Sequence, residues 1–201
     1  VLFSTAARDA SRRDFTVNAL FYDPGRREVL DFVGGWADLG AGRLRAIGCP
    51  EDRFREDHLR MLRAVRFAAS LGFELESATA AAVARLAPSV VSVSAERVFS
   101  ELTRMLLGPA PDRAFELAGE LGLLDVLLPG VAAMRGVAQP PEFHPEGDVW
   151  EHTVLMLRKM RWCDDVLAWS VLLHDVGKPP THEFRDGRDR FPNHARAGVK
   201  L

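Results

Sequence analysis

The sequence predicts a mainly α-helical chain with a short α/β piece at its N-terminus. Residues 15–33 are rich in β-branched and aromatic side chains on both sides of a turn at Asp23–Gly25, which is typical of two paired strands. From Pro50 onward, apolar residues recur at helical spacing. Prolines and glycines gather in 136–148, so we expect a loop or linker between two helical segments.

The elements are expected in the following order. Two strands over 15–23 and 27–33 precede a Gly-Gly turn at 34–39 and a short strand at 43–48. One long helix is expected from Pro50 to Gly72, because its apolar side chains fall on a single stripe. The remaining expected elements are helices over 77–87, 94–107, 111–128 with a break near Gly122, 149–161 and 164–176, a hairpin around Asp186–Gly187, and a helix from Asn193.

Composition narrows the class of protein. The 201 residues carry 26 Lys and Arg against 28 Asp and Glu, so the net charge of −2 does not by itself indicate a nucleic-acid binder. The two cysteines, Cys49 and Cys163, are far apart, which argues against a disulfide framework and favours a reducing compartment such as the cytoplasm. No apolar run is long enough for a membrane span, and no membrane partner is expected.

Segment 55–67 mixes charged and apolar positions and allows two interpretations. On one helix, Glu56 and Asp57 would lie four and three residues before Arg60, with Arg63 continuing the same polar face. This face is either solvated and laced with weak ion pairs, or built to recognise a base. An arginine only donates and an ionised aspartate only accepts, so the two side by side complement cytosine and adenine and mismatch uracil and guanine.

Three blocks resemble the bacterial-type (class II) tRNA nucleotidyltransferase and poly(A) polymerase family. They are "RRDFTVNAL" (12–20), "DFVGGWADL" (31–39) and "EDHLRMLRAVRFAA" (56–69), in this order and at short spacing. The resemblance implies that residues 1–48 are the C-terminal part of a nucleotidyltransferase head, the end of its palm. It implies that residues 49–135 are a helical neck that binds RNA and selects the nucleotide.

The resemblance also implies roles for individual residues. Arg13, Asp14 and Asn18 match the positions that contact the ribose and phosphates of the incoming nucleotide. Glu56, Asp57 and Arg60 match the template that selects CTP and ATP, and Arg63 continues it. The helix 94–107 resembles the neck helix that follows. We expect its charged residues to pair within the helix and to support the template: Glu96, Arg97, Glu101 and Arg104.

The implied activity is addition of C and/or A to the 3′ end of tRNA from CTP and ATP, without a nucleic-acid template. A poly(A) polymerase, or an enzyme that adds only CC or only A, remains open. Such transfer needs Mg²⁺ ions held by an Asp-x-Asp strand ahead of the first block. The chain begins with Val1 and shows no such strand before Arg12, so we expect an internal piece of a longer protein with no catalytic carboxylate of its own.

Residues 144–201 carry a second pattern, in which "HPEGDVWEHT" (144–153) precedes "LLHDVGKPPTH" (172–182). A His-Asp doublet at a helix end, with an earlier His on a neighbouring helix, is typical of HD-type metal domains. The candidate ligands of a divalent metal are His152, His174 and Asp175, with His182 and His194 as further candidates.

The second pattern resembles HD-type domains fused to tRNA nucleotidyltransferases, truncated before the Asp that closes such sites. Three interpretations remain open for it. The domain is a metal-dependent phosphohydrolase or phosphodiesterase, in which metal activates water; or it keeps the fold only as a structural body that faces RNA; or its histidines are ordinary core residues.

Overall fold

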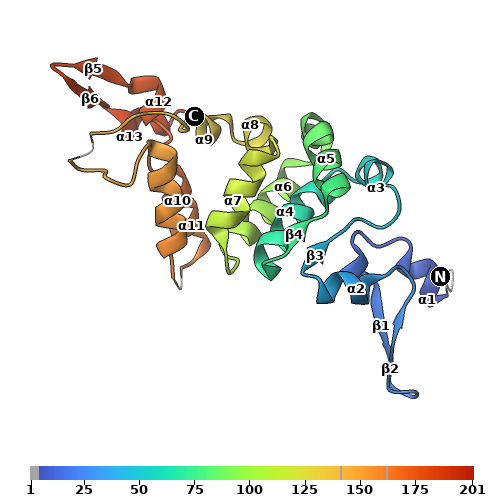
Figure 1. Ribbon diagram of the computed structural model, residues 1–201. Helices are drawn as coiled ribbons and strands as arrows, with labels where there is room; N and C mark the ends of the chain where they lie inside the picture. Colours follow the sequence, from blue (N-terminus) through green and yellow to red (C-terminus); the bar gives the residue numbers. More distant parts are fainter. Residues whose placement is uncertain (1–4, 141, 162) are drawn as a thin grey trace.

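The computed structural model describes residues 5–140, 142–161 and 163–201. The positions outside the described residues fall in the predicted segment 1–48, in the predicted loop 136–148 and between two predicted helices: 1–4, 141 and 162. The described elements form an elongated chain, with helices side by side between one hairpin near the N-terminus and another near the C-terminus (Figure 1). The mainly helical fold with an N-terminal α/β piece is confirmed.

The N-terminal piece is built around an antiparallel hairpin. Its elements are α1 (Ala6–Ala10), the 3-10 helix η1 (Thr16–Ala19), β1 (Leu20–Asp23), β2 (Glu28–Asp31), α2 (Gly35–Gly40) and β3 (Arg43–Leu44). The predicted hairpin is confirmed, but its first strand begins at Leu20, after η1. The Asp31 carboxylate accepts four backbone N–H groups between Val33 and Trp36. This acid therefore fixes the turn that leads into α2.

The predicted long helix after Pro50 is wrong, because the structure has two helices there. The first is α3 (Pro50–Glu56) and the second is α4 (Leu59–Leu71). Asp57 separates them with an extended backbone, φ −157° and ψ 103°. Its carboxylate accepts a hydrogen bond from the Leu59 N–H at 3.1 Å, which helps start the second helix. Both helices bury apolar residues in one core, so the apolar stripe runs through the break.

The remaining elements follow the predicted order. They are β4 (Glu74–Leu75), α5 (Ser77–Leu86), the 3-10 helix η2 (Ala87–Ser92), α6 (Ala95–Leu106), α7 (Pro111–Glu120), α8 (Leu123–Leu127), α9 (Pro129–Ala132), α10 (Val149–Lys159), α11 (Asp165–Leu173), α12 (Lys178–Thr181), β5 (Glu183–Arg185), β6 (Arg188–Arg190) and α13 (His194–Gly198). The break near Gly122 and the hairpin around Asp186–Gly187 are confirmed. The short strand β3 pairs in parallel with β4.

One hydrophobic core runs through most of the helices. In it, α4 packs against α6 and α7, while α10 and α11 pack against α7 and α6. Leu157 on α10 and Leu172 on α11 are fully buried in the same cluster as Leu62 on α4. The segment from 144 onward is thus joined to the neck by shared packing. No helix in the described ranges is long and apolar enough to cross a membrane.

Candidate nucleotide cavity and metal centre

A cavity of about 560 Å³ lies where the link between α1 and η1 meets the α3–α4 break and α6. Six of the seven predicted nucleotide-contacting residues line it: Arg13, Asp14, Asn18, Asp57, Arg60 and Arg63. The structure thus brings together residues from segments more than forty positions apart in the sequence. The cavity wall also includes residues to which the sequence assigned no contact with a nucleotide: Arg12, Leu59, Phe67 and Arg97.

Asp14 is buried, and both of its carboxylate oxygens are occupied. One accepts from the Phe15 N–H at 2.9 Å and from Asn18 Nδ2 at 3.0 Å; the other accepts from Arg63 Nε at 2.8 Å and Nη2 at 2.6 Å. Burial alone would raise the pKa of Asp14, but the hydrogen bonds from Asn18 and Arg63 outweigh it and keep the pKa below its usual value. Asp14 therefore joins the head piece to α4 as an ionised acceptor.

Arg60 is held by Glu56, not by Asp57 as expected. Its Nη1 lies 2.6 Å from Glu56 Oε2 and 2.9 Å from the carbonyl oxygen of Arg53, and its Nη2 lies 3.4 Å from the carbonyl oxygen of Arg12. The expectation that Asp57 fixes Arg60 on one helix is wrong, because the helix ends before Asp57. Glu56 does not line the cavity and instead supports the guanidinium that does.

Asp57 points to a different helix. Its Oδ2 accepts from Arg97 Nη2 on α6 at 2.7 Å. Arg97 therefore supports Asp57 of the predicted template, as expected for this helix, but does not pair within its own helix as was also expected. Burial alone would raise the pKa of Asp57. The hydrogen bonds from Arg97 and the Leu59 N–H outweigh this effect and keep the pKa below its usual value, so the carboxylate stays an ionised acceptor. The two members of the predicted base-reading pair thus face one cavity, and each is fixed by its own partner.

Glu101 on α6 is a buried anchor for arginines. It accepts from Arg66 Nε at 2.7 Å and from Arg104 Nη1 at 3.0 Å, and Arg63 Nη1 lies 4.0 Å away. The expected pair with Arg104 inside the helix is confirmed, whereas the bond to α4 was not expected. The guanidinium groups of Arg63 and Arg66 also lie over the ring of Phe67, at 5.2 and 4.2 Å from its centroid. Glu101 and the Phe67 ring therefore help to hold the arginines of α4 in place beside the cavity.

The predicted metal ligands His152, His174 and Asp175 come together between α10 and the end of α11, with their candidate ligand atoms within 4.8 Å of one another. Asp175 Oδ2 lies 3.1 Å from His174 Nε2, and Asp175 Oδ1 lies 3.7 Å from His194 Nε2. His194 therefore reaches the Asp175 carboxylate, although it does not belong to the set of three whose ligand atoms lie within 4.8 Å of one another. His182 does not reach it, because its Nε2 contacts Asp189 at 2.6 Å.

The histidine rings are oriented for ligation. His174 Nδ1 lies 2.8 Å from the Val171 carbonyl oxygen, and His194 Nδ1 lies 3.1 Å from that of Phe191. A carbonyl oxygen only accepts, so each Nδ1 donates and each Nε2 is the nitrogen that faces Asp175. Without metal, His174 Nε2 donates to Asp175; a metal bound there would take the place of that proton. Ligand atoms about 2 Å from one ion lie roughly 3 Å from each other, and imidazole with carboxylate suits a divalent transition metal. These side chains therefore fit a metal.

Neighbouring positive groups keep the Asp175 carboxylate ionised. The hydrogen bond with Asp175 raises the pKa of His174 and outweighs the effect of burial. Burial would raise the pKa of Asp175, but His174 and Lys178 hold it well below its usual range. Lys178 is itself buried, with its Nζ 2.8 Å from Asp175 Oδ2 and 2.5 Å from Gln139 Oε1. A carboxylate this strongly stabilised stays ionised, and a metal would take the place of the His174 proton beside it.

Two residues beside the centre, His144 and Glu146, were not among the predicted ligands. Glu146 contacts His152 Nδ1 and lies 3.2 Å from His144 Nδ1. Its own backbone N–H and His152 lower the pKa of Glu146 to about 2. Both residues belong to the motif "HPEGDVWEHT", so the signal was present, but spacing gave no reason to choose them. The structure shows that they form a second group around His152.

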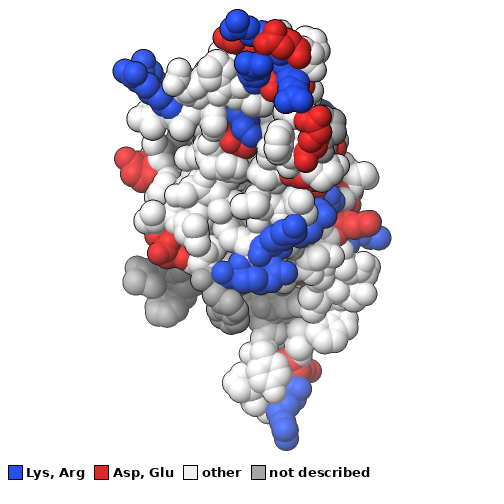
Figure 2. Space-filling view, turned by 90° about the vertical axis from the view of Figure 1, so that its left-hand side faces the viewer, with Lys and Arg blue, Asp and Glu red and all other residues white. Residues whose placement is uncertain are grey.

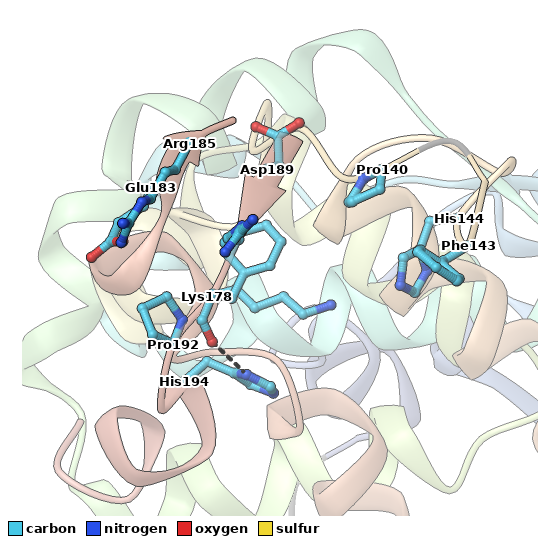
Figure 3. A pocket seen from close by; sticks show the side chains of 11 residues that line it. Pro140, Phe143, His144, Lys178, Glu183, Arg185, Asp189, Pro192 and His194 are labelled. Atoms are coloured by element: carbon cyan, nitrogen blue, oxygen red, sulfur yellow. Dashed lines mark hydrogen bonds between the residues drawn. The ribbon is translucent and has the colours of Figure 1, made fainter. Parts of the chain in front are cut away.

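A second cavity, of about 570 Å³, adjoins this centre. His144, Lys178 and His194 line it with the ring of Phe143, as Figure 3 shows from close by. Phe191 also lines this cavity. Figure 2 shows the same end of the molecule, where positive and negative side chains gather together at the top over β5–β6. The hairpin beside the cavity therefore carries charge of both signs.

Two family models match the chain. Residues 2–45 match the model described as "Poly A polymerase head domain", and residues 72–135 match "Probable RNA and SrmB- binding site of polymerase A". The "Multifunctional CCA protein" of Halorhodospira halophila is 42% identical over 202 residues, covering 97% of this chain and 47% of that protein. That of Pasteurella multocida is 36% identical, covering 96% and 47%. The chain thus spans about half the length of the curated relatives it matches.

Solved structures agree with these matches. The crystal structure of the Bacillus stearothermophilus CCA-adding enzyme in complex with CTP is similar with a TM-score of 0.71 and 32% identity, covering 100% of this chain and 44% of that one. The Thermotoga maritima CCA-adding enzyme complexed with tRNA shares the fold, with a TM-score of 0.58 and 22% identity over 84% of this chain and 44% of that one. The two family models together match more than half of the sequence. The chain belongs to the tRNA nucleotidyltransferase and poly(A) polymerase family.

Proposed function

We propose that this chain is the nucleotide-selecting and neck part of a tRNA nucleotidyltransferase, which adds C and A to the tRNA 3′ end from CTP and ATP. The cavity at the α3–α4 break carries the proposal, because it gathers Asp57, Arg60 and Arg63 with Arg13 and Asn18. The similarity to an enzyme solved in complex with CTP supports it.

Selection of the base rests on fixed hydrogen-bonding groups. Asp57, held by Arg97, offers an acceptor, and Arg60, held by Glu56, offers donors in the same cavity. Cytosine and adenine each present an amine donor beside a ring-nitrogen acceptor, so they satisfy both groups. Uracil and guanine would leave both groups unpaired, and unpaired polar groups in a partly buried site are costly.

The remaining arginines of the cavity suit the triphosphate. Arg12, Arg13 and Arg63 line it, and a planar guanidinium matches phosphate oxygens in a bidentate manner. Mg²⁺ ions would neutralise the transferring phosphoryl group and are held, in such enzymes, by carboxylates ahead of Arg12. The contribution of this chain is to bind and orient CTP or ATP and to present tRNA along the neck.

The experiment compares Asp57→Ala and Arg60→Ala with the unchanged full-length protein. Incorporation of CTP, ATP, UTP and GTP is measured on a tRNA that lacks its 3′ CCA. We expect the preference for CTP over UTP to fall by roughly 100-fold, because each variant removes one charged hydrogen-bonding group. Unchanged selectivity in both variants would overturn the proposal.

A matched control comes from α3, the helix that precedes Asp57. Asp52 and Arg55 form an ion pair on α3 with exposed side chains, outside the cavity. Asp52→Ala and Arg55→Ala are expected to keep the selectivity of the unchanged protein. The length and sequence of the added tail, read on a gel in the same assay, separate CCA addition from CC-only, A-only or poly(A) addition.

A second candidate function rests on the metal centre. We propose that residues 144–201 form an HD-type domain in which His152, His174, Asp175 and His194 hold one divalent metal. The Nε2 atoms of His174 and His194 face Asp175 while each Nδ1 is held by a carbonyl oxygen, which supports this donor set. A divalent metal at such a site lowers the pKa of bound water and promotes phosphoester hydrolysis. In this chain the residues hold the ion and orient Asp175 through Lys178.

Metal analysis of the purified full-length protein tests this centre. His174→Ala and Asp175→Asn are expected to lose one equivalent of transition metal relative to the unchanged protein. His182→Ala is the control, because His182 contacts Asp189 instead of the centre. Equal metal content in all three variants and in the unchanged protein would overturn the centre, as would a metal loss in His182→Ala alone.

A further inference from the structure

We infer that Glu146 is the positioning residue of this metal centre: its carboxylate holds Nδ1 of His152, so that Nε2 is the nitrogen offered to a metal. The inference rests on the proposed metal centre and adds to it a residue for which the sequence gave no role. Its basis is the contact between Glu146 Oε1 and His152 Nδ1, together with the position of the His152 ring 5.4 Å from that of His174.

The contact decides the tautomer of His152. An ionised carboxylate has no proton to donate, so His152 Nδ1 must carry the hydrogen and Nε2 must carry the lone pair. His174 and His194 reach the same state through backbone carbonyl oxygens. In all three rings Nδ1 is thus held and Nε2 is the nitrogen left for a metal, but only in His152 is Nδ1 held by a charged group. A carboxylate behind a ligating imidazole fixes its orientation and raises its basicity.

The loop that carries Glu146 is itself fixed at both sides. The Asp148 carboxylate accepts from the Gly136 N–H at 2.6 Å and from the Glu151 N–H at 2.7 Å, and Glu151 returns a bond to the Asp148 N–H. Gly147 has φ +129°, and a Cβ there would lie 1.6 Å from Glu151 Oε2. Only glycine allows this passage from Glu146 into α10, so the carboxylate is placed by rigid local structure.

His144 is a second donor to the same carboxylate oxygen, at 3.2 Å. Its ring lies edge-on to that of His152, with centroids 4.8 Å apart. His144, Glu146 and His152 could also be the ligands of a second cation, because their ligand atoms lie within 4.8 Å of one another. A neutral imidazole has one lone pair, however, and the bond to Glu146 leaves that pair on Nε2. We therefore assign this trio to positioning.

Cobalt titration of the full-length protein tests the role of Glu146. The site is defined as the Co²⁺ equivalent that His174→Ala loses. We expect one such ion, bound roughly 10- to 100-fold more weakly in Glu146→Ala. Glu146→Gln keeps an acceptor oxygen but loses the charge, so it should fall between Glu146→Ala and the unchanged protein. Glu142→Ala, an exposed carboxylate in the same loop, is the control and should bind as the unchanged protein does.

A spectroscopic readout separates positioning from general damage. In ¹⁵N-histidine NMR of the metal-free protein, His152 should be the Nδ1–H tautomer in the unchanged protein and in Glu146→Gln, and a mixture in Glu146→Ala. Equal Co²⁺ affinity in Glu146→Ala overturns the role of Glu146 alone. Two ions in the unchanged protein that fall to one in Glu146→Ala also overturn it, since Glu146 is then a ligand. No Co²⁺ in the unchanged protein overturns the metal centre itself.

Discussion

Arg97 on α6 and Asp57 at the α3–α4 break form an ion pair, with Arg97 Nη2 2.7 Å from Asp57 Oδ2. Because the backbone of Asp57 is extended, no side chain one turn away on the same helix holds its carboxylate. The direction of its carboxylate is therefore set by two bonds, one from Arg97 and one from the Leu59 N–H. The neck helix α6 thereby determines how the proposed base acceptor faces the cavity.

Arg97→Ala is expected to reduce selectivity more than stability. The Arg97 side chain is 51% exposed, so loss of the pair should lower the free energy of unfolding by at most about 1 kcal/mol. Asp57 would keep only the Leu59 N–H, and we expect the preference for CTP over UTP to fall about tenfold. Urea unfolding and nucleotide incorporation by the full-length protein measure the two effects. Arg113→Ala, an exposed arginine on α7, is the control; an unchanged preference in Arg97→Ala would contradict the prediction.

Asp14→Asn is expected to destabilise the fold in a pH-dependent way. The variant leaves Arg63 without its carboxylate, which should cost about 3 kcal/mol at pH 7. The pKa of Asp14 is lowered in the folded state, so its contribution is complete well above 3.8 and is lost as the pH falls through the lower folded value. Urea unfolding at pH 7, 5 and 3 measures the difference in the free energy of unfolding between the unchanged protein and Asp14→Asn. This difference should be the same at pH 7 and 5 and smaller at pH 3. A difference that grows toward acid pH would contradict this reasoning.

The residues of the nucleotide cavity could be predicted from sequence, but their connections could not. The motifs grouped Arg13, Asp14 and Asp57, and the structure places all three around one cavity. The apolar stripe gave no sign of the break at Asp57, because residues of both helices enter the same core. Asp57 pairs with a residue 40 positions away and Asp14 with one 49 positions away. Such pairs depend on how the helices pack, which local spacing does not determine.

At the proposed metal centre, the sequence pattern identified the candidate ligands but not the residues that hold them in place. The His-Asp doublet identified His174 and Asp175 from a helix end, and the structure places them there. Glu146 precedes α10 in a loop, and its direction depends on the Asp148 cap and on the backbone at Gly147. Loop geometry of this kind is not encoded in a periodic pattern. A capping signal at Asp148, three residues before Glu151, could have indicated where the loop ends.

Glu101→Gln is expected to be strongly destabilising. Glu101 is 2% exposed and neutralises the guanidinium groups of Arg66 and Arg104. The neutral amide removes the charge while keeping the shape of the side chain. The free energy of unfolding, measured by urea titration, should therefore fall by about 3 kcal/mol. Glu96→Gln, on the exposed face of the same helix, is the control and should change it by less than about 0.5 kcal/mol. Equal stability of the two variants would show that the arginines find other partners.

Gly177→Ala is expected to weaken metal binding through the backbone. A Cβ at Gly177 would lie 2.0 Å from the His194 carbonyl oxygen and 2.6 Å from the Gly198 nitrogen, so α13 must move away. His194 would then move from its place 3.7 Å from Asp175 Oδ1, and we expect roughly tenfold weaker Co²⁺ binding. Gly40→Ala, where a Cβ meets nothing within 4 Å, is the control and should keep both affinity and Tm. A lowered Tm with unchanged Co²⁺ affinity in Gly177→Ala would show that His194 is not a ligand, because the backbone that carries it had moved while the ion stayed bound.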